Sequence, residues 1–176
     1  CDIMNKLNIQ EIKTSFVNIR EVRRYRHQEK INQRAAKFFE RAESLTVGGS
    51  VSKAVPIYEK ILKRSPNHLG ALNRLGNILR EDGNPQRALK LHVRAAEIVP
   101  DSLEVLYSLA DDYAAMAMNA EEMETLEKIL KLDQNSPRPL YRLRATHLKT
   151  GDWALVSDVQ KKLISRIEDT EEKEKE

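Results

Sequence analysis

Small residues recur at a fixed interval along the chain. Gly49, Gly83 and Gly151 occupy three of four equivalent places and Ala117 occupies the other, so that each place follows the last after 34 residues. A constant period of this length is typical of stacked helix-turn-helix units, which cannot bury their own apolar faces and must pack against neighbours. The spacing therefore predicts an all-α fold made of repeated helix pairs.

The residues between these small residues follow helical periods. The blocks of 34 residues begin at Ala35, Leu69, Leu103 and Pro137. Places 4, 7, 8 and 11 of each block are mostly apolar or small, as are places 20, 24 and 27, and each set shares one face of a helix. Glycine at place 15 ends the first helix and proline at place 32 ends the second. We predict helices at roughly 35–47, 51–64, 69–81, 85–98, 103–116, 120–132, 137–149 and 153–168.

The block 69–102 fits best, because Gly76 and Ala88 let its two helices approach closely. Arg41, Glu122 and Arg144 stand where the other blocks have apolar or small residues. The whole pattern resembles the tetratricopeptide repeat family. The resemblance implies a right-handed α-solenoid of about four helix-turn-helix repeats, at 35–68, 69–102, 103–136 and 137–168.

In the fold that this chain resembles, the first helix of each pair lines a concave groove through places 2, 5, 9 and 12. The predicted partner-groove residues are Phe39, Asn73, Asn77, Arg80, Tyr107, Asp111 and Tyr141. Aromatic anchors together with side-chain amides suit an extended peptide or a helix. Phe39 and Glu43 stand where the chaperone-tail-binding subclass has a lysine and an asparagine, so we do not expect that ligand.

Residues 1–34 precede the repeats and contain no glycine or proline, so we expect one long helical arm from about Ile9 into the first repeat. An apolar stripe precedes a basic stripe along this arm. The apolar stripe is Ile9, Ile12, Phe16 and Ile19. The basic stripe is Arg23, Arg26, Lys30, Arg34, Lys37 and Arg41. The arm either docks on a larger assembly, with its basic side toward anionic lipid or an acidic protein, or is a solvated face tempered by nearby glutamates.

The C-terminal end combines an apolar helix face with a charged tail. The apolar face consists of Val156, Val159, Leu163 and Ile167. No polar capping helix follows it, so a partner covers this face, the arm folds back on it, or the natural chain continues. Residues 169–176 hold no apolar side chain and are expected to form a fraying helix end or a disordered tail.

The composition excludes several classes of function. The net charge of +3 is too small to indicate nucleic acid by itself, and only Tyr25 interleaves with the basic stripe, which disfavours a base-stacking surface. No run of about 18 apolar residues is present to span a bilayer. Cys1 is the only cysteine, so the chain has no internal disulfide and no thiolate metal cluster. Cys1 is either the lipidated first residue of a bacterial lipoprotein or an arbitrary start of the chain.

No set of residues has the spacing of a catalytic, cofactor or metal site. His92 and His147 fall on core places of the repeat, and we expect them to be packed side chains. Asp111 and Asp112 are adjacent on one helix and therefore point in different directions. Trp153 is expected to anchor the last helix by packing. We therefore expect no enzyme, no cofactor and no metal.

A second resemblance is carried by three segments. The run Leu75–His92, the run Leu109–Tyr113 and the run Gly151–Trp153 are similar to the lipopolysaccharide assembly protein B family. This resemblance implies a bacterial adaptor at the inner membrane that couples a membrane protease to its substrate. The membrane helix and the cysteine-based metal site of that family have no counterpart in this sequence.

The sequence thus predicts a non-enzymatic adaptor or scaffold for protein–protein interaction. Its groove would hold a peptide or helix, and its arm would dock on a larger, membrane-associated complex. The alternatives are a structural subunit bound mainly through the arm and the exposed last helix, and an anionic-membrane binder that uses the basic stripe. The expected location is cytoplasmic or peripheral at the inner-membrane face, or lipid-anchored through Cys1.

Overall fold

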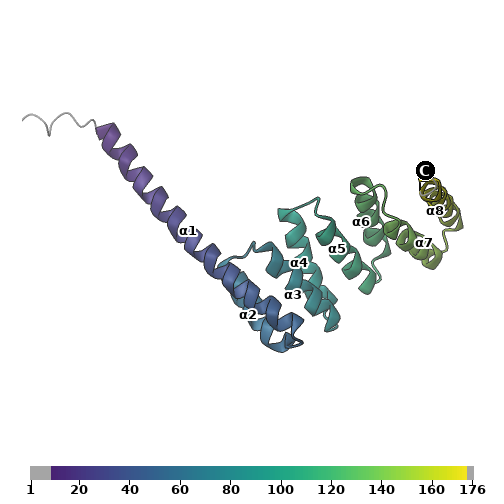
Figure 1. The fold of residues 1–176 in the computed structure, drawn as a ribbon, viewed down its shortest axis with the longest axis horizontal. Helices are drawn as coiled ribbons and strands as arrows, with labels where there is room; N and C mark the ends of the chain where they lie inside the picture. Colours follow the sequence, from purple (N-terminus) through teal and green to yellow (C-terminus); the bar gives the residue numbers. More distant parts are fainter. Residues whose placement is uncertain (1–8, 174–176) are drawn as a thin grey trace, which may run out of the picture. The chain divides into compact units, whose positions relative to one another are not determined.

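The computed structural model describes residues 9–173, which form eight α-helices with no strand among them (Figure 1). The helices are α1 (Ile9–Val47), α2 (Val51–Arg64), α3 (Leu69–Glu81), α4 (Pro85–Ile98), α5 (Leu103–Ala115), α6 (Asn119–Leu132), α7 (Arg138–Thr150) and α8 (Trp153–Lys173). The predicted all-α class is confirmed, and most predicted helix ends lie within one residue of the observed ends. The chain divides into two compact units, one with α1 and α2 and the other with α3–α8.

In the first unit, α1 is a single helix of 39 residues that joins the predicted arm to the first helix of the first repeat. α2 packs along the C-terminal part of α1 only (Figure 1). Ala42 on α1 and Ala54 on α2 are fully buried, as expected of the small residues that let paired helices approach. Tyr58 lies edge-on to Phe39, with 5.9 Å between ring centroids.

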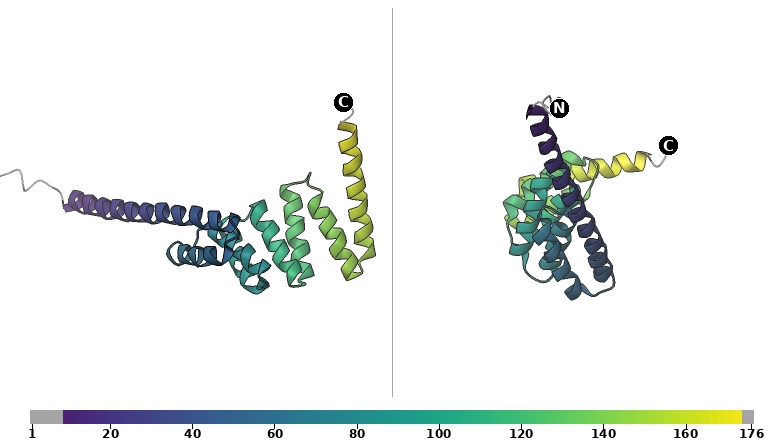
Figure 2. Two further views of the ribbon diagram at one scale, coloured as in Figure 1. Left: turned by 60° about the horizontal axis from the view of Figure 1, so that its bottom comes forward. Right: turned by 90° about the vertical axis from the view of Figure 1, so that its left-hand side faces the viewer.

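The second unit stacks three helix pairs, α3–α4, α5–α6 and α7–α8. Each helix also packs against the next one in the chain, as the side view shows (Figure 2). Apolar side chains from four successive helices share one core. Its members are Leu106, Leu109, Ala110, Leu126, Ile129, Leu140, Leu143, Val159 and Leu163. This packing buries the apolar faces that no single pair could bury alone.

Gly76 on α3 lies directly against His92 on α4. A methyl group at Gly76 would lie 2.4 Å from Nε2 of His92, so the helix has no room for any side chain there. The imidazole of His92 is completely buried in the space that Gly76 leaves. The predictions that His92 and His147 are packed side chains are confirmed, because both are buried.

The C-terminal end differs from the sequence expectation in two respects. Trp153 is 69% exposed, so the prediction that it packs as an anchor is wrong. The neighbouring last turn of α7, residues 148–150, is itself exposed, so no described residue covers the indole. α8 continues as a helix to Lys173 and thus includes most of the predicted tail, whereas residues 174–176 lie outside the described part.

Two predictions fall on residues that the structure does not describe in full. Cys1, the candidate for lipidation, lies outside the described residues. The side chains of Ile9, Ile12 and Phe16 on the arm, and that of Ile167 on α8, are also outside the description. Ile19, the last member of the apolar stripe on the arm, is exposed.

The four turns between paired helices share a left-handed residue. Gly49, Gly83 and Gly151 have φ values of 75°, 78° and 77°, and Ala117 has a φ of 56°. Glycine adopts this conformation without a steric penalty, whereas the Cβ of alanine clashes with the neighbouring carbonyl oxygen. The third repeat therefore keeps the turn of its neighbours with a strained residue.

We expect Ala117→Gly to stabilise the protein by about 0.5–1 kcal/mol, because it removes this strain. Urea unfolding followed by circular dichroism measures the change. Gly83→Ala is the matched control, since it introduces the same strain at the equivalent turn and should destabilise the protein by a similar amount. A loss of stability in Ala117→Gly would contradict the assignment of this turn.

Candidate binding surface

The first helices of the three pairs in the second unit, α3, α5 and α7, present one shared face. Polar side chains join these helices directly. The amide of Asn73 on α3 donates to Oε1 of Glu104 at 2.6 Å and accepts from the hydroxyl of Ser108 at 3.0 Å, both on α5. Asp111 on α5 pairs with Arg142 on α7. We call this surface the first-helix face, and it corresponds to the groove side predicted from the repeat.

A buried carboxylate lies at the base of this face. Asp112 is completely buried, and its two oxygens lie 3.1 Å from Nη1 of Arg80 and 2.5 Å from Nδ1 of His92. Nε2 of His92 in turn donates to the backbone carbonyl of Asn73, at 3.2 Å. Because buried charges are tolerated only when they are paired and hydrogen-bonded, these contacts tie α3, α4 and α5 together.

The same chain of charges continues toward α7. Asp111 lies 3.7 Å from Nη2 of Arg80 and 2.5 Å from Nη1 of Arg142. The other guanidinium nitrogen of Arg142 donates to Glu122 at 2.8 Å. Thr146 on α7 donates to the second oxygen of Glu122 at 3.2 Å. Acid and base thus alternate across five helices, and we call this set the ion network. Its members are His92, Asp112, Arg80, Asp111, Arg142 and Glu122.

Sequence reasoning missed the ion network and had only one signal for it. Glu122 stands at place 20, where the other repeats have Ala54, Ala88 and Val156. A buried acid at a place for small residues requires a partner, and Arg142 lies 20 residues later in the chain. Asp111 and Asp112 were expected to point in different directions, yet both carboxylates contact Arg80, and Asp111 also reaches Arg142.

The predicted partner-groove residues fall into two groups. Asn73, Arg80 and Asp111 are engaged within the protein, and Asn73 is buried. Tyr141 is exposed, and Tyr107 and Asn77 are half-buried. The ring of Tyr107 is half-buried and lies under the guanidinium of Arg138, with 4.4 Å between the guanidinium carbon and the ring centroid.

Tyr141 is 47% exposed at the equivalent place one repeat later. Asn77 is half-buried, and its side-chain oxygen is itself buried, with no hydrogen-bond partner among the described residues. Phe39, the seventh predicted residue, belongs to the first unit, where its ring packs against Tyr58. The aromatic groups that the first-helix face offers to a partner are therefore the two tyrosine rings.

Tyr113, near the C-terminal end of α5, has a perturbed hydroxyl. Burial raises the pKa of Tyr113, and the carboxylates of Glu121, Glu124 and Asp112 raise it further. A higher pH is therefore needed to deprotonate this hydroxyl than that of an ordinary tyrosine. Tyr113 lines an open hollow of about 530 Å³ between α5 and α6, together with Glu121 and Glu124.

All six members of the basic stripe on α1 are exposed, and none forms an ion pair within the described chain. No helix among the described residues is long and apolar enough to cross a membrane. Within the same part of the chain, histidine, cysteine and carboxylate side chains form no group of three that could hold a metal ion.

The comparisons with known proteins agree with the repeat pattern. Residues 57–90 match the model of a family described as tetratricopeptide repeat, over a stretch one period long. The structure of MamA (41-end) from Desulfovibrio magneticus RS-1 superimposes with a TM-score of 0.69 at 20% identity, covering 77% of this chain and 76% of that one. The fold is that of a tetratricopeptide repeat protein. The resemblance predicted from the sequence is confirmed.

Two further proteins that resemble this chain differ in length. YrrB, whose structure is described as having an unusual peptide-binding site, gives a TM-score of 0.68 at 18% identity and covers 75% of this chain and 68% of its own. The sequence is 26% identical over 120 residues to superkiller complex protein 3 of Mus musculus. That alignment covers 68% of this chain but only 8% of the mouse protein, so the chain spans a small part of that relative.

The two neighbouring aspartates of α5 provide a test of the ion network. Asp112→Ala should destabilise the protein by about 3–5 kcal/mol, because it leaves His92 buried and unpaired. Asp111→Ala should cost about 1 kcal/mol or less, since the Asp111 side chain is 34% exposed and its pairs are screened by water. Urea unfolding of both variants measures the difference. Equal losses would show that burial of Asp112 does not govern its contribution.

Proposed function

We propose that the protein is a non-enzymatic scaffold for protein–protein interaction, whose partner peptide or helix binds the first-helix face. The observation that carries the proposal is the pair of tyrosine rings, Tyr107 and Tyr141, at the same place in consecutive repeats. Aromatic side chains supply large contact area at low entropic cost, and they are enriched among the residues that dominate binding energy.

The ion network supports this proposal by holding the face rigid. Arg80 and Arg142 are each fixed by two carboxylates, so α3, α5 and α7 keep their spacing before a partner arrives. A surface that is already ordered loses less conformational entropy on binding, which increases affinity. The same pairing removes Arg80 and Asp111 from the set of free partner contacts. The selectivity of the face is therefore expected to depend on the aromatic rings more than on charge.

Two relatives support an adaptor role in a larger assembly. One structural neighbour is described with a peptide-binding site, and the mouse relative is named as part of a complex. By this proposal the exposed arm of α1 docks the scaffold on a larger complex. A place at the bacterial inner membrane, as implied by the second sequence resemblance, belongs to the proposal as well.

Peptide selection tests the first-helix face. Peptides selected from a random library on the wild-type protein should lose at least about tenfold in affinity for Tyr107→Ala/Tyr141→Ala, because two anchors of about 1 kcal/mol or more are removed. Fluorescence anisotropy measures the affinity. Val93→Ala/Leu132→Ala is the matched control, since these apolar residues are exposed on the second helices α4 and α6. Peptides that bind the tyrosine variant as well as they bind the control would refute the proposed surface.

A second function, binding of an anionic membrane by the arm, is favoured by the exposure of all six cations of the basic stripe. Each cation near an anionic leaflet contributes about 1 kcal/mol, and salt screens the attraction. The wild-type protein should therefore cosediment with phosphatidylserine vesicles at low salt and dissociate at high salt. Arg23→Gln/Arg26→Gln/Lys30→Gln should reduce the bound fraction of protein. Vesicle binding that changes neither with salt concentration nor with these substitutions would exclude this function.

A further inference from the structure

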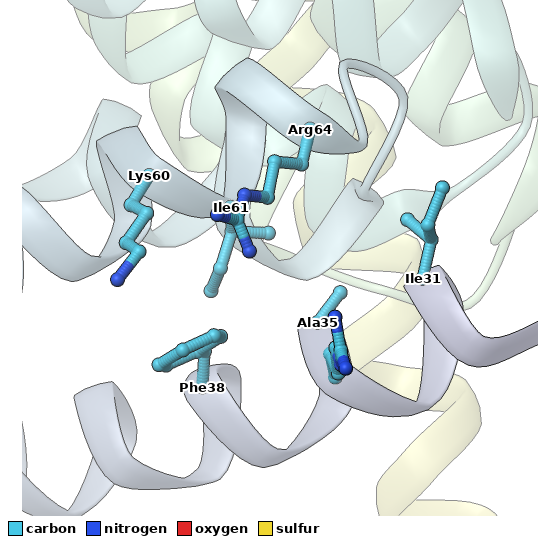
Figure 3. A pocket seen from close by; sticks show the side chains of 7 residues that line it. Ile31, Ala35, Phe38, Lys60, Ile61 and Arg64 are labelled. Carbon is cyan, nitrogen blue, oxygen red and sulfur yellow. The ribbon is translucent and has the colours of Figure 1, made fainter.

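A hollow lies in the first unit between α1 and α2, at the end where α1 continues past the repeat into the arm. Its volume is about 310 Å³, and seven residues from the two helices line it. Side chains of α1 and α2 face one another across it (Figure 3). The lining residues are Ile31, Arg34, Ala35 and Phe38 from α1 and Lys60, Ile61 and Arg64 from α2. We call this feature the arm pocket.

The arm pocket exists because the arm overhangs the first repeat. Ile31 and Arg34 precede the first repeat, which begins at Ala35, so part of the pocket wall comes from the arm. The inner lining is apolar: Ala35 and Ile61 are buried, and Ile31 and Phe38 are half-buried. A space of this size accommodates one or two bulky apolar side chains of a ligand.

Three cations surround this apolar lining, and no acidic side chain lines the pocket. Arg34, Lys60 and Arg64 are exposed, and none of them forms an ion pair within the described part of the chain. Nζ of Lys60 lies 4.7 Å from the centroid of the Phe38 ring, which holds this ammonium beside the apolar lining. Lys60 and Arg64 are one helical turn apart on α2, while Arg34 faces them from α1.

We propose that the arm pocket binds an acidic protein segment, in which one bulky apolar side chain enters the hollow and flanking carboxylates pair with Arg34, Lys60 and Arg64. The charge of the first unit supports an acidic partner. Residues 1–66 hold 14 Lys and Arg against 7 Asp and Glu, whereas residues 67–176 hold 16 against 20. The net charge of the first unit, +7, is thus larger than that of the whole chain.

The geometry favours a protein segment over nucleic acid or lipid. Phosphate backbones need cations but gain nothing from an apolar hollow, and the lining offers no exposed aromatic platform for stacking a base. A lipid carries its negative charge in a single headgroup, whereas the cations here lie on both sides of the hollow. Several carboxylates around one apolar anchor match this arrangement. This site is separate from the first-helix face, so it stands independently of the proposed function.

The test uses a fluorescein-labelled synthetic peptide with one phenylalanine flanked on both sides by pairs of glutamates, titrated with the full chain. Anisotropy should report saturable binding. Arg34→Glu/Arg64→Glu should weaken that binding by about tenfold, because two attractive pairs become repulsive. Ile31→Ala should also weaken it, by removing part of the apolar wall. Ile31 is only half-buried and precedes the repeat, so circular dichroism should show an unchanged fold.

The matched control is Lys37→Glu/Lys63→Glu, which changes the net charge equally with exposed residues of the same two helices outside the pocket. It should leave the affinity within about twofold of wild type, since remote surface charges are screened. Equal weakening by both charge-reversal pairs would overturn the proposal, because binding would then follow net charge alone.

Two changes of ligand complete the test. A peptide with lysines in place of the glutamates, or serine in place of the phenylalanine, should bind much more weakly than the original peptide. Equal binding of the serine peptide would overturn the role of the hollow, as would absence of saturable binding by the original. Phosphatidylserine vesicles that bind wild type, compete with the peptide and are lost in Arg34→Glu/Arg64→Glu alone would assign the pocket to lipid and likewise overturn the proposal.

Discussion

The close approach of the two helices within each of the first two repeats is the constraint on which the rest of the structure depends. It requires very small residues at the crossing, and Ala42, Ala54 and Ala88 are all completely buried there. At Gly76 the absence of a side chain also leaves the space that the imidazole of His92 occupies. Once the helices are this close, their outer apolar faces can be covered only by the next pair, which produces the stacking of α3–α8.

The buried histidine has consequences beyond its own repeat. His92 on α4 orients Asp112 on α5, and Asp112 in turn holds Arg80 on α3. A fold driven only by leucine contacts would tolerate small rotations of each pair. A buried, fully paired carboxylate tolerates much less, since an unpaired charge in the interior is strongly unfavourable. The polar contacts therefore set the spacing of the first-helix face, while the apolar contacts supply most of the stability.

The repeats become less regular toward the C-terminus, and the structure shows a different solution in each. The third repeat replaces the small residue at place 20 with Glu122, whose carboxylate reaches across to Arg142 on α7. The fourth has Arg144 at place 8, which donates to Gln160 of α8 but keeps one buried nitrogen with no hydrogen-bond partner among the described residues. This less complete packing agrees with the exposure of Trp153, Leu155 and Ile164 on α8.

The sequence alone determined the number, ends and pairing of the helices, because period, turn glycines and small residues at the crossings act locally or at a constant spacing. It also located the continuous helix of α1 and the buried positions of His92 and His147. Only the tertiary structure decided which polar residues are free. The repeat pattern places Asn73, Arg80 and Asp111 among the ligand contacts. In the structure, Asn73 and Arg80 on α3 bind side chains of α5, and Asp111 on α5 binds a side chain of α7. Their partners lie about one repeat away in the chain, so the pairing depends on how the helices stack. The arm pocket likewise depends on tertiary structure, because side chains of both α1 and α2 line it.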